Sequence, residues 1–152
     1  MRNYVFLLKN DDIVHSLDII MEQLEIKATA ETPQINFDPQ SGEMMIKGRA
    51  IPQDAEAFWA PVLKWFYAYA AAPQKHTSFV LDMEYFNIST SKQLLFFLHK
   101  LNELKEDGYN VSVIWKYPEG DIEMRESGND YSCMVDIPFQ FVEKSSPIAR
   151  AV

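Results

Sequence analysis

The sequence has few of the residues from which disulfides, metal centres and phosphate-binding loops are built. It contains one cysteine, three isolated histidines and five glycines among 152 residues. A single cysteine excludes an intrachain disulfide and a paired-cysteine metal site. The glycines do not fall into the spacings that cradle nucleotide phosphates. We therefore expect no metal, no cofactor and no catalytic residue.

Long apolar runs and an excess of positive charge are also missing. No apolar stretch approaches the roughly 18 residues that span a bilayer. The first short apolar run is followed by Lys9, Asp11 and Asp12, which is unlike a signal peptide. The chain has 22 acidic and 14 basic residues, a formal net charge of -8, and this charge opposes binding to nucleic acid and to anionic membranes. We expect a cytoplasmic protein with neither of these partners.

The sequence does contain enough apolar material for a well-packed domain. Hydrophobic residues make up 47% and aromatic residues 13% of the chain, and its length suits one domain. Periodicity predicts an antiparallel hairpin and then alternating helices and strands. The predicted ranges are strands 35–37 and 43–49, helix 54–72, strand 78–84, helix 91–107, strand 111–117, helix 121–129 and strand 137–142. A helical crossover makes strands 78–84 and 111–117 parallel neighbours. This order predicts a small α/β sandwich with a mixed sheet of about four to five strands, an N-terminal hairpin and helices mainly on one face.

The first thirty residues differ from the remainder of the chain. A short strand or hydrophobic anchor is expected near residues 4–8, followed by a helix from Asp11 or Asp12 to about Glu25. A Thr-Pro pair at residues 32–33 then interrupts the pattern. We divide the chain into an N-terminal extension over 1–30, a folded domain over 31–143 and a flexible tail over 144–152.

A polar turn over residues 85–92 lies between a predicted strand and a predicted helix. It places several hydroxyl groups at a helix N-terminus, where free amides and the helix dipole suit a cap, an anion or a phosphorylated side chain. Asp82 and Glu84 precede the turn on one predicted strand face. They could form a carboxylate pair for acid–base chemistry, but no partnering base is evident, and charges for solvation or docking are the simpler interpretation.

Several short motifs occur in a fixed order between residues 31 and 142. They are Thr32-Pro33-Gln34-Ile35, Asp38-Pro39 with Gly42, Gly48-Arg49 with Pro52, Phe58-Trp59 with Pro61-Val62 and Trp65, Tyr85-Phe86-Asn87 with Ser89 and Ser91-Lys92, and Trp115 with Tyr117. In this order they resemble the SiaC family of bacterial regulatory phosphoproteins. Residues 1–30 lie outside the resemblance.

The resemblance implies a non-enzymatic, STAS-like signalling domain of the anti-anti-sigma type that acts by partner switching. A histidine-kinase-like Ser/Thr kinase would phosphorylate it and a PP2C-like phosphatase would reverse the reaction. The unphosphorylated form would bind and activate a diguanylate cyclase, with cyclic di-GMP signalling and biofilm behaviour as the output. The implied docking face comprises Asp82, Glu84, Tyr85, Asn87, Ile88, Ser91 and Lys92.

The sequence departs from the family pattern at the residue that matters most for this switch. The family pattern implies a phosphorylatable threonine at the position that Ile88 occupies. Either Ser89, the first choice, or Thr90, the second, takes the phosphate, or the protein docks constitutively as a scaffold. A small-molecule-binding or enzymatic α/β domain that uses Asp82, Glu84 and Tyr85 remains the alternative from another class.

Overall fold

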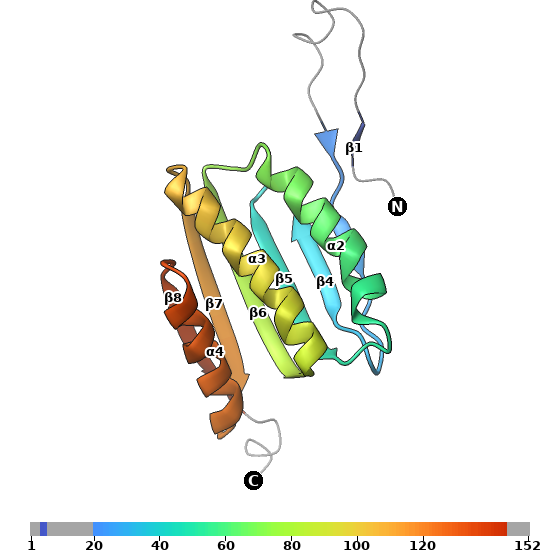
Figure 1. The fold of residues 1–152 in the computed structure, drawn as a ribbon, viewed down its shortest axis with the longest axis vertical. Helices are drawn as coiled ribbons and strands as arrows, with labels where there is room; N and C mark the ends of the chain where they lie inside the picture. Colours follow the sequence, from blue (N-terminus) through green and yellow to red (C-terminus); the bar gives the residue numbers. More distant parts are fainter. Residues whose placement is uncertain (1–3, 6–19, 146–152) are drawn as a thin grey trace, which may run out of the picture.

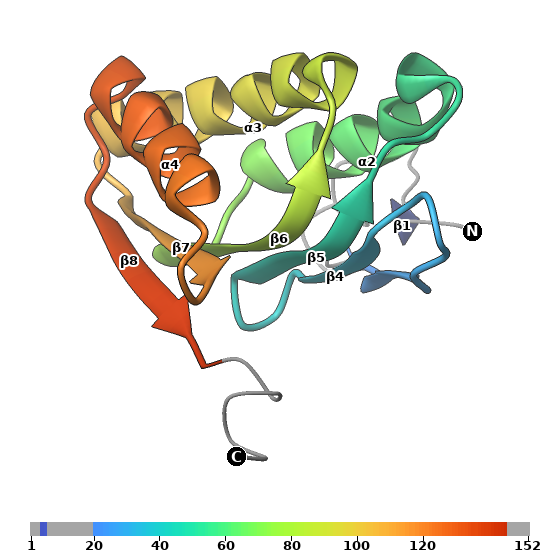
Figure 2. The ribbon, with the colours of Figure 1, turned by 90° about the horizontal axis from the view of Figure 1, so that it is seen from below.

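The computed structural model describes residues 4–5 and 20–145, and it contains one mixed six-stranded sheet covered by helices on one face (Figures 1 and 2). The strand order in this sheet is β3-β4-β5-β6-β7-β8. The described elements, in chain order, are β1 (Tyr4–Val5), β2 (Ile20–Met21), β3 (Leu24–Ile26), β4 (Gln34–Asp38), β5 (Glu43–Ala50), α2 (Ala55–Ala70), β6 (His76–Phe86), α3 (Ile88–Glu106), β7 (Asn110–Pro118), α4 (Ile122–Met134) and β8 (Phe139–Lys144).

The connections between the strands confirm the α/β fold that the sequence predicts. The strands β3, β4 and β5 pair antiparallel, whereas β5 through β8 pair parallel and are joined by the three helices. The predicted hairpin is β4–β5, and the predicted parallel neighbours are β6 and β7. In Figure 2 the helices α2, α3 and α4 lie on the same side of the sheet, and none of the described helices lies on the other side. We call this uncovered side the open face.

The sixth strand comes from residues for which the sequence predicts a helix. That prediction is wrong over residues 20–25, where the chain forms β2 and the start of β3. Leu24 and Ile26 lie opposite Phe37 and Ile35 of β4, and burial of Leu24 against this strand outweighs the helical spacing of the apolar residues. The earlier part of the predicted helix lies outside the described residues.

Aromatic side chains fill the layer between the sheet and the helices. Phe37, Phe66, Phe79 and Phe97 are fully buried, and their ring centroids lie 5.4–6.1 Å apart. Rings at these distances prefer tilted or edge-to-face contacts, which these pairs adopt. The resulting core fixes α2 and α3 against the sheet, and therefore fixes the N-terminus of α3.

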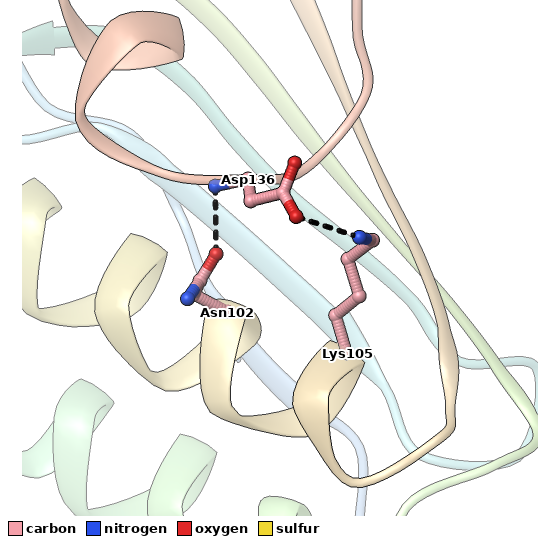
Figure 3. Close-up of polar contacts among 3 residues, drawn as sticks. All are labelled: Asn102, Lys105 and Asp136. Carbon is pink, nitrogen blue, oxygen red and sulfur yellow. Dashed lines mark hydrogen bonds and ion pairs between the residues drawn. The ribbon is translucent and has the colours of Figure 1, made fainter.

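Contacts at two points within α4 and one point just after it hold this helix in place. The indole N–H of Trp115 donates to the Met124 carbonyl at 3.0 Å, and the Tyr131 hydroxyl donates to the Ser91 carbonyl at 2.7 Å. Beyond the helix, the Asp136 amide donates to the Asn102 side chain at 2.8 Å, and the Asp136 carboxylate pairs with Lys105 at 3.1 Å (Figure 3). The helix is longer than predicted and is part of the folded layer.

Two further properties concern only residues 4–5 and 20–145. No helix among them is long and apolar enough to cross a membrane. No group of three or more His, Cys, Asp or Glu side chains among them is placed to hold a metal ion.

Candidate functional site

The polar turn between β6 and α3 is built as a helix cap. The Asn87 side chain accepts a hydrogen bond from the Thr90 amide at 2.9 Å, and the Asn87 carbonyl accepts one from the Ser91 amide at 2.9 Å. The Asn87 amide donates to the Ala50 carbonyl at the end of β5. These contacts hold the first turn of α3 at the C-terminal edge of the parallel strands, where ligands and partners of α/β folds commonly bind.

The three hydroxyl groups of this turn have different surroundings. Thr90 is fully buried, and its Oγ1 accepts a hydrogen bond from the Trp59 indole N–H at 3.4 Å. The Ser91 hydroxyl donates to the Ile88 carbonyl at 2.6 Å and is therefore occupied within the turn. Ser89 is exposed. Of the two residues that the sequence offers for phosphorylation, only Ser89 presents its hydroxyl at the surface.

An apolar side chain and a cation flank the exposed serine. Ile88, the first residue of α3, is 77% exposed. Lys92 is also exposed and follows Ser89 by three residues, a spacing that brings side chains together on a helix surface. The structure thus brings together five of the predicted residues. Asn87 caps α3, Ile88, Ser89 and Ser91 lie in its first turn, and Lys92 follows that turn.

A shallow hollow of about 270 Å³ lies beside this turn, between α3 and α4. Its apolar lining includes Phe86, Leu95, Tyr131 and Met134. Burial raises the pKa of Tyr131 to about 12, so its hydroxyl stays protonated as a donor to the Ser91 carbonyl. The sequence predicts a helix over residues 121–129 only, so it provides no reason to expect Tyr131 and Met134 in this lining.

The remaining predicted docking residues lie at the end of β6, toward the open face. The pairing of β5 with β6 shifts register between Gly48 and Arg49, so Glu84 is the extra residue of a β-bulge. The bulge places Tyr85 opposite Arg49; the side chain of Tyr85 is 50% exposed, and the Arg49 guanidinium carbon lies 5.6 Å from its ring centroid.

Asp82 is separated from the first turn of α3 by the sheet. It is 6% exposed, its side chain is directed to the open face, and it forms an ion pair with Lys144. The sequence analysis assigned Lys144 to the tail, whereas it is the last residue of β8. This pairing engages the Asp82 carboxylate and argues against its use as a free base beside Glu84.

Comparisons with known proteins agree with the fold and extend the interpretation. The SiaC family regulatory phosphoproteins match residues 26–144 of this chain. An uncharacterized protein of Pseudomonas aeruginosa (strain UCBPP-PA14) is 27% identical over 119 residues, which are 78% of this chain and 94% of that protein.

Two solved structures from Pseudomonas aeruginosa share the fold over most of the chain. One is SiaC, with 27% identity and a TM-score of 0.74 over 82% of this chain and 100% of that one. The other is the crystal structure of diguanylate cyclase SiaD in complex with its activator SiaC, with 26% identity and a TM-score of 0.76 over 80% of this chain and 99% of the matched one.

Proposed function

Because the chain belongs to the SiaC family of regulatory phosphoproteins, we propose that it regulates a partner protein through a docking face at the N-terminus of α3. As a member of this family the chain is a regulator and not an enzyme, as its sequence predicts. The docking face comprises the first turn of α3 together with Lys92, the adjacent hollow, and Glu84 and Tyr85 at the end of β6.

The proposed target is a diguanylate cyclase. A structurally similar chain is the SiaC of Pseudomonas aeruginosa, which is described as the activator of the diguanylate cyclase SiaD. A cyclase partner for the present chain would place it in cyclic di-GMP signalling and in the control of biofilm behaviour. The proposal extends to a histidine-kinase-like Ser/Thr kinase and a PP2C-like phosphatase, acting in the cytoplasm, as the enzymes that set its phosphorylation state.

The observation that carries the proposed switch is the exposure of Ser89 in the first turn of a helix. The first amides of a helix have no partners within it, and the Asn87 side chain takes only that of Thr90. A phosphate on Ser89 would therefore be held by the helix dipole, worth about 0.3–1 kcal/mol at such a site. Lys92 is close enough along the helix to pair with it.

Such a phosphate changes the docking face without unfolding the domain. It adds roughly 1.5–2 negative charges at neutral pH, and these charges would appear beside the exposed side chain of Ile88. A partner that buries Ile88 would then have to bury or desolvate the phosphate, which is costly without a matching cation. Phosphorylation at Ser89 is therefore expected to release the partner.

The exposure of Ile88 also supports a second candidate function. An exposed isoleucine at the position that the family pattern gives to threonine cannot be phosphorylated, and it offers a permanent apolar contact. A scaffold that docks its partner constitutively would need only this contact and the hollow beside it.

Phosphosite mass spectrometry after incubation with the cognate kinase and ATP distinguishes the two functions. We expect one phosphate, on Ser89, which a PP2C-like phosphatase removes and which Ser89→Ala abolishes. Ser91→Ala is the matched control and should leave phosphorylation unchanged. A phosphate on Thr90 or Ser91 would contradict the assignment of the acceptor, and no phosphate on any of the three would favour the scaffold.

A further inference from the structure

A cluster of positive charge lies on the open face of the sheet, toward the C-terminal ends of β5, β7 and β8. Alternation along the strands directs Phe79, Leu81 and Met83 of β6 to the helices, so the residues between them are directed to the open face. On this face four cations lie toward the C-terminal ends of the strands, and we call them the cationic patch. Its members are Lys47 and Arg49 of β5, Lys116 of β7 and Lys144 of β8.

The patch is organised around the nearly buried carboxylate of Asp82. Lys47 lies directly opposite Asp82 on one neighbouring strand, and Lys116 lies directly opposite on the other. Lys144 reaches across β7 from β8 to form the ion pair. One carboxylate thus lies among three lysines and neutralises a single charge.

The other cations of the patch have no carboxylate partner in the described part of the chain. The ion pairs found there join Lys100 with Glu103, Lys105 with Asp136 and Lys144 with Asp82. Glu84 is the second carboxylate near the patch, so four cations face two anions there in a chain whose net charge is -8. Three further carboxylates of the same face, those of Glu25, Asp38 and Glu43, lie in other rows of the sheet, away from the patch. A local positive charge on a negatively charged protein orients an acidic partner, because the net charge of the chain repels the partner and the patch attracts it.

A row of apolar side chains lies next to the patch. Met45, Val80 and Ile114 are opposite one another on β5, β6 and β7, two residues before the row of Lys47, Asp82 and Lys116. Met45 and Ile114 are partly exposed, and Val80 between them is 9% exposed. These three strands span two inter-strand spacings, about 10 Å in all, which is the length of about two turns of an α-helix at about 5.4 Å per turn. The face therefore offers an apolar strip about two helical turns long, running across the strands, with cations along one side.

We propose that the open face binds an acidic amphipathic helix of a partner protein, with its apolar side on the row of Met45, Val80 and Ile114 and its carboxylates on the cationic patch. A second copy of this chain is disfavoured as the occupant, because the patches of two copies would repel one another. Nucleic acid is disfavoured by the net charge of the chain, which is -8. Apart from Arg49, which contacts Tyr85 of the docking face, the surface lies on the side of the sheet opposite α3 (Figure 2), so the inference goes beyond the proposed function.

A labelled peptide tests this surface without any cognate partner. The probe is a fluorescein-labelled helical peptide of about six turns (3.6 residues per turn) with leucine on one face and glutamate on the other; its binding is followed by fluorescence anisotropy. We expect the affinity for the peptide to fall as salt is added. In the double variant Lys47→Glu with Lys116→Glu the affinity should fall at least about tenfold, or 1.4 kcal/mol. The matched control is Lys64→Glu with Lys75→Glu, which makes the same charge change at exposed sites elsewhere and should stay within about twofold of wild type.

Amide chemical-shift mapping on the wild-type protein gives a second readout that does not depend on the variants. The expected shifts concentrate on β5, β6 and β7. Equal weakening by both double variants, shifts that concentrate on the helices, equally tight binding of a peptide with lysine in place of glutamate, or a dimer formed through the open face would each overturn the proposal.

Discussion

Replacing Thr90 with valine should destabilise the protein, because the hydroxyl of Thr90 is a structural group and not a surface one. Its Oγ1 accepts the indole N–H of Trp59 at 3.4 Å, and both residues are fully buried. Valine keeps the shape and removes the acceptor, so the Trp59 N–H is left buried without a partner. Such a loss costs about 1–3 kcal/mol, and the long distance places the expected cost near 1 kcal/mol.

Urea denaturation followed by tryptophan fluorescence measures this cost. Ser89→Ala is the matched control, since it removes a neighbouring hydroxyl that is exposed, and it should change the free energy of unfolding by less than about 0.5 kcal/mol. A double-mutant cycle with Trp59→Phe isolates the hydrogen bond from the cavity that the smaller ring creates. We expect a coupling energy of about 1 kcal/mol between the two sites.

Two results would refute this reasoning. One is a cost for Thr90→Val no larger than that for Ser89→Ala. The other is strict additivity of Thr90→Val and Trp59→Phe. Either would mean that Trp59 does not anchor Thr90 in the core, and a kinase could then reach the hydroxyl of Thr90 as well as that of Ser89.

Three further predictions follow from the packing around the site. Gly128→Ala would place a Cβ 2.5 Å from the indole ring of Trp115, so it should lower the free energy of unfolding by about 1–3 kcal/mol; an unchanged urea midpoint would contradict the packing of α4. The pKa of Tyr131 is raised by burial from 10.0 to about 12, so the folded state holds this proton more tightly than the unfolded state. This difference should contribute fully to the free energy of unfolding below pH 10, and the contribution should be lost as the pH rises through 12. In Tyr131→Phe the free energy of unfolding should fall less over this pH range. An identical fall in the variant would contradict the assignment. Deleting residues 1–30 should lower the melting temperature more than deleting residues 1–19, because only the longer deletion removes β3 and the bond from the Trp65 indole to the Glu22 carbonyl; equal melting temperatures would make residues 20–30 a dispensable extension.

The sequence was sufficient to predict the order of helices and strands from β4 onward, because each element there buries one face. Apolar residues alternate with polar ones in β5 and β7 and recur at helical spacing in α2 and α3, and these periods indicate the buried face directly. The same reasoning failed over residues 20–25, where three residues at the edge of the sheet are too few to establish a period.

Features that depend on contacts distant in sequence could not be predicted. The sequence offers Ser89 and Thr90 as neighbouring hydroxyl groups in the same polar turn. The structure shows which of them is buried, because Thr90 packs against Trp59, 31 residues away. The β-bulge at Glu84 depends on the pairing with β5, and the ion pair of Asp82 with Lys144 joins residues 62 positions apart. For this reason the sequence placed Asp82 on a docking face, whereas the structure places it in an ion pair on the open face.

The most direct test of the proposed regulation is the rate of cyclic di-GMP synthesis by the cognate diguanylate cyclase, with and without this protein. Wild-type protein that has not been phosphorylated and Ser89→Ala should both raise the rate. Protein phosphorylated on Ser89 should leave the rate near that of the cyclase alone, and treatment with the PP2C-like phosphatase should restore the stimulation. A rate that none of these forms raises, or that all of them raise equally, would contradict the proposal that Ser89 switches a cyclase activator.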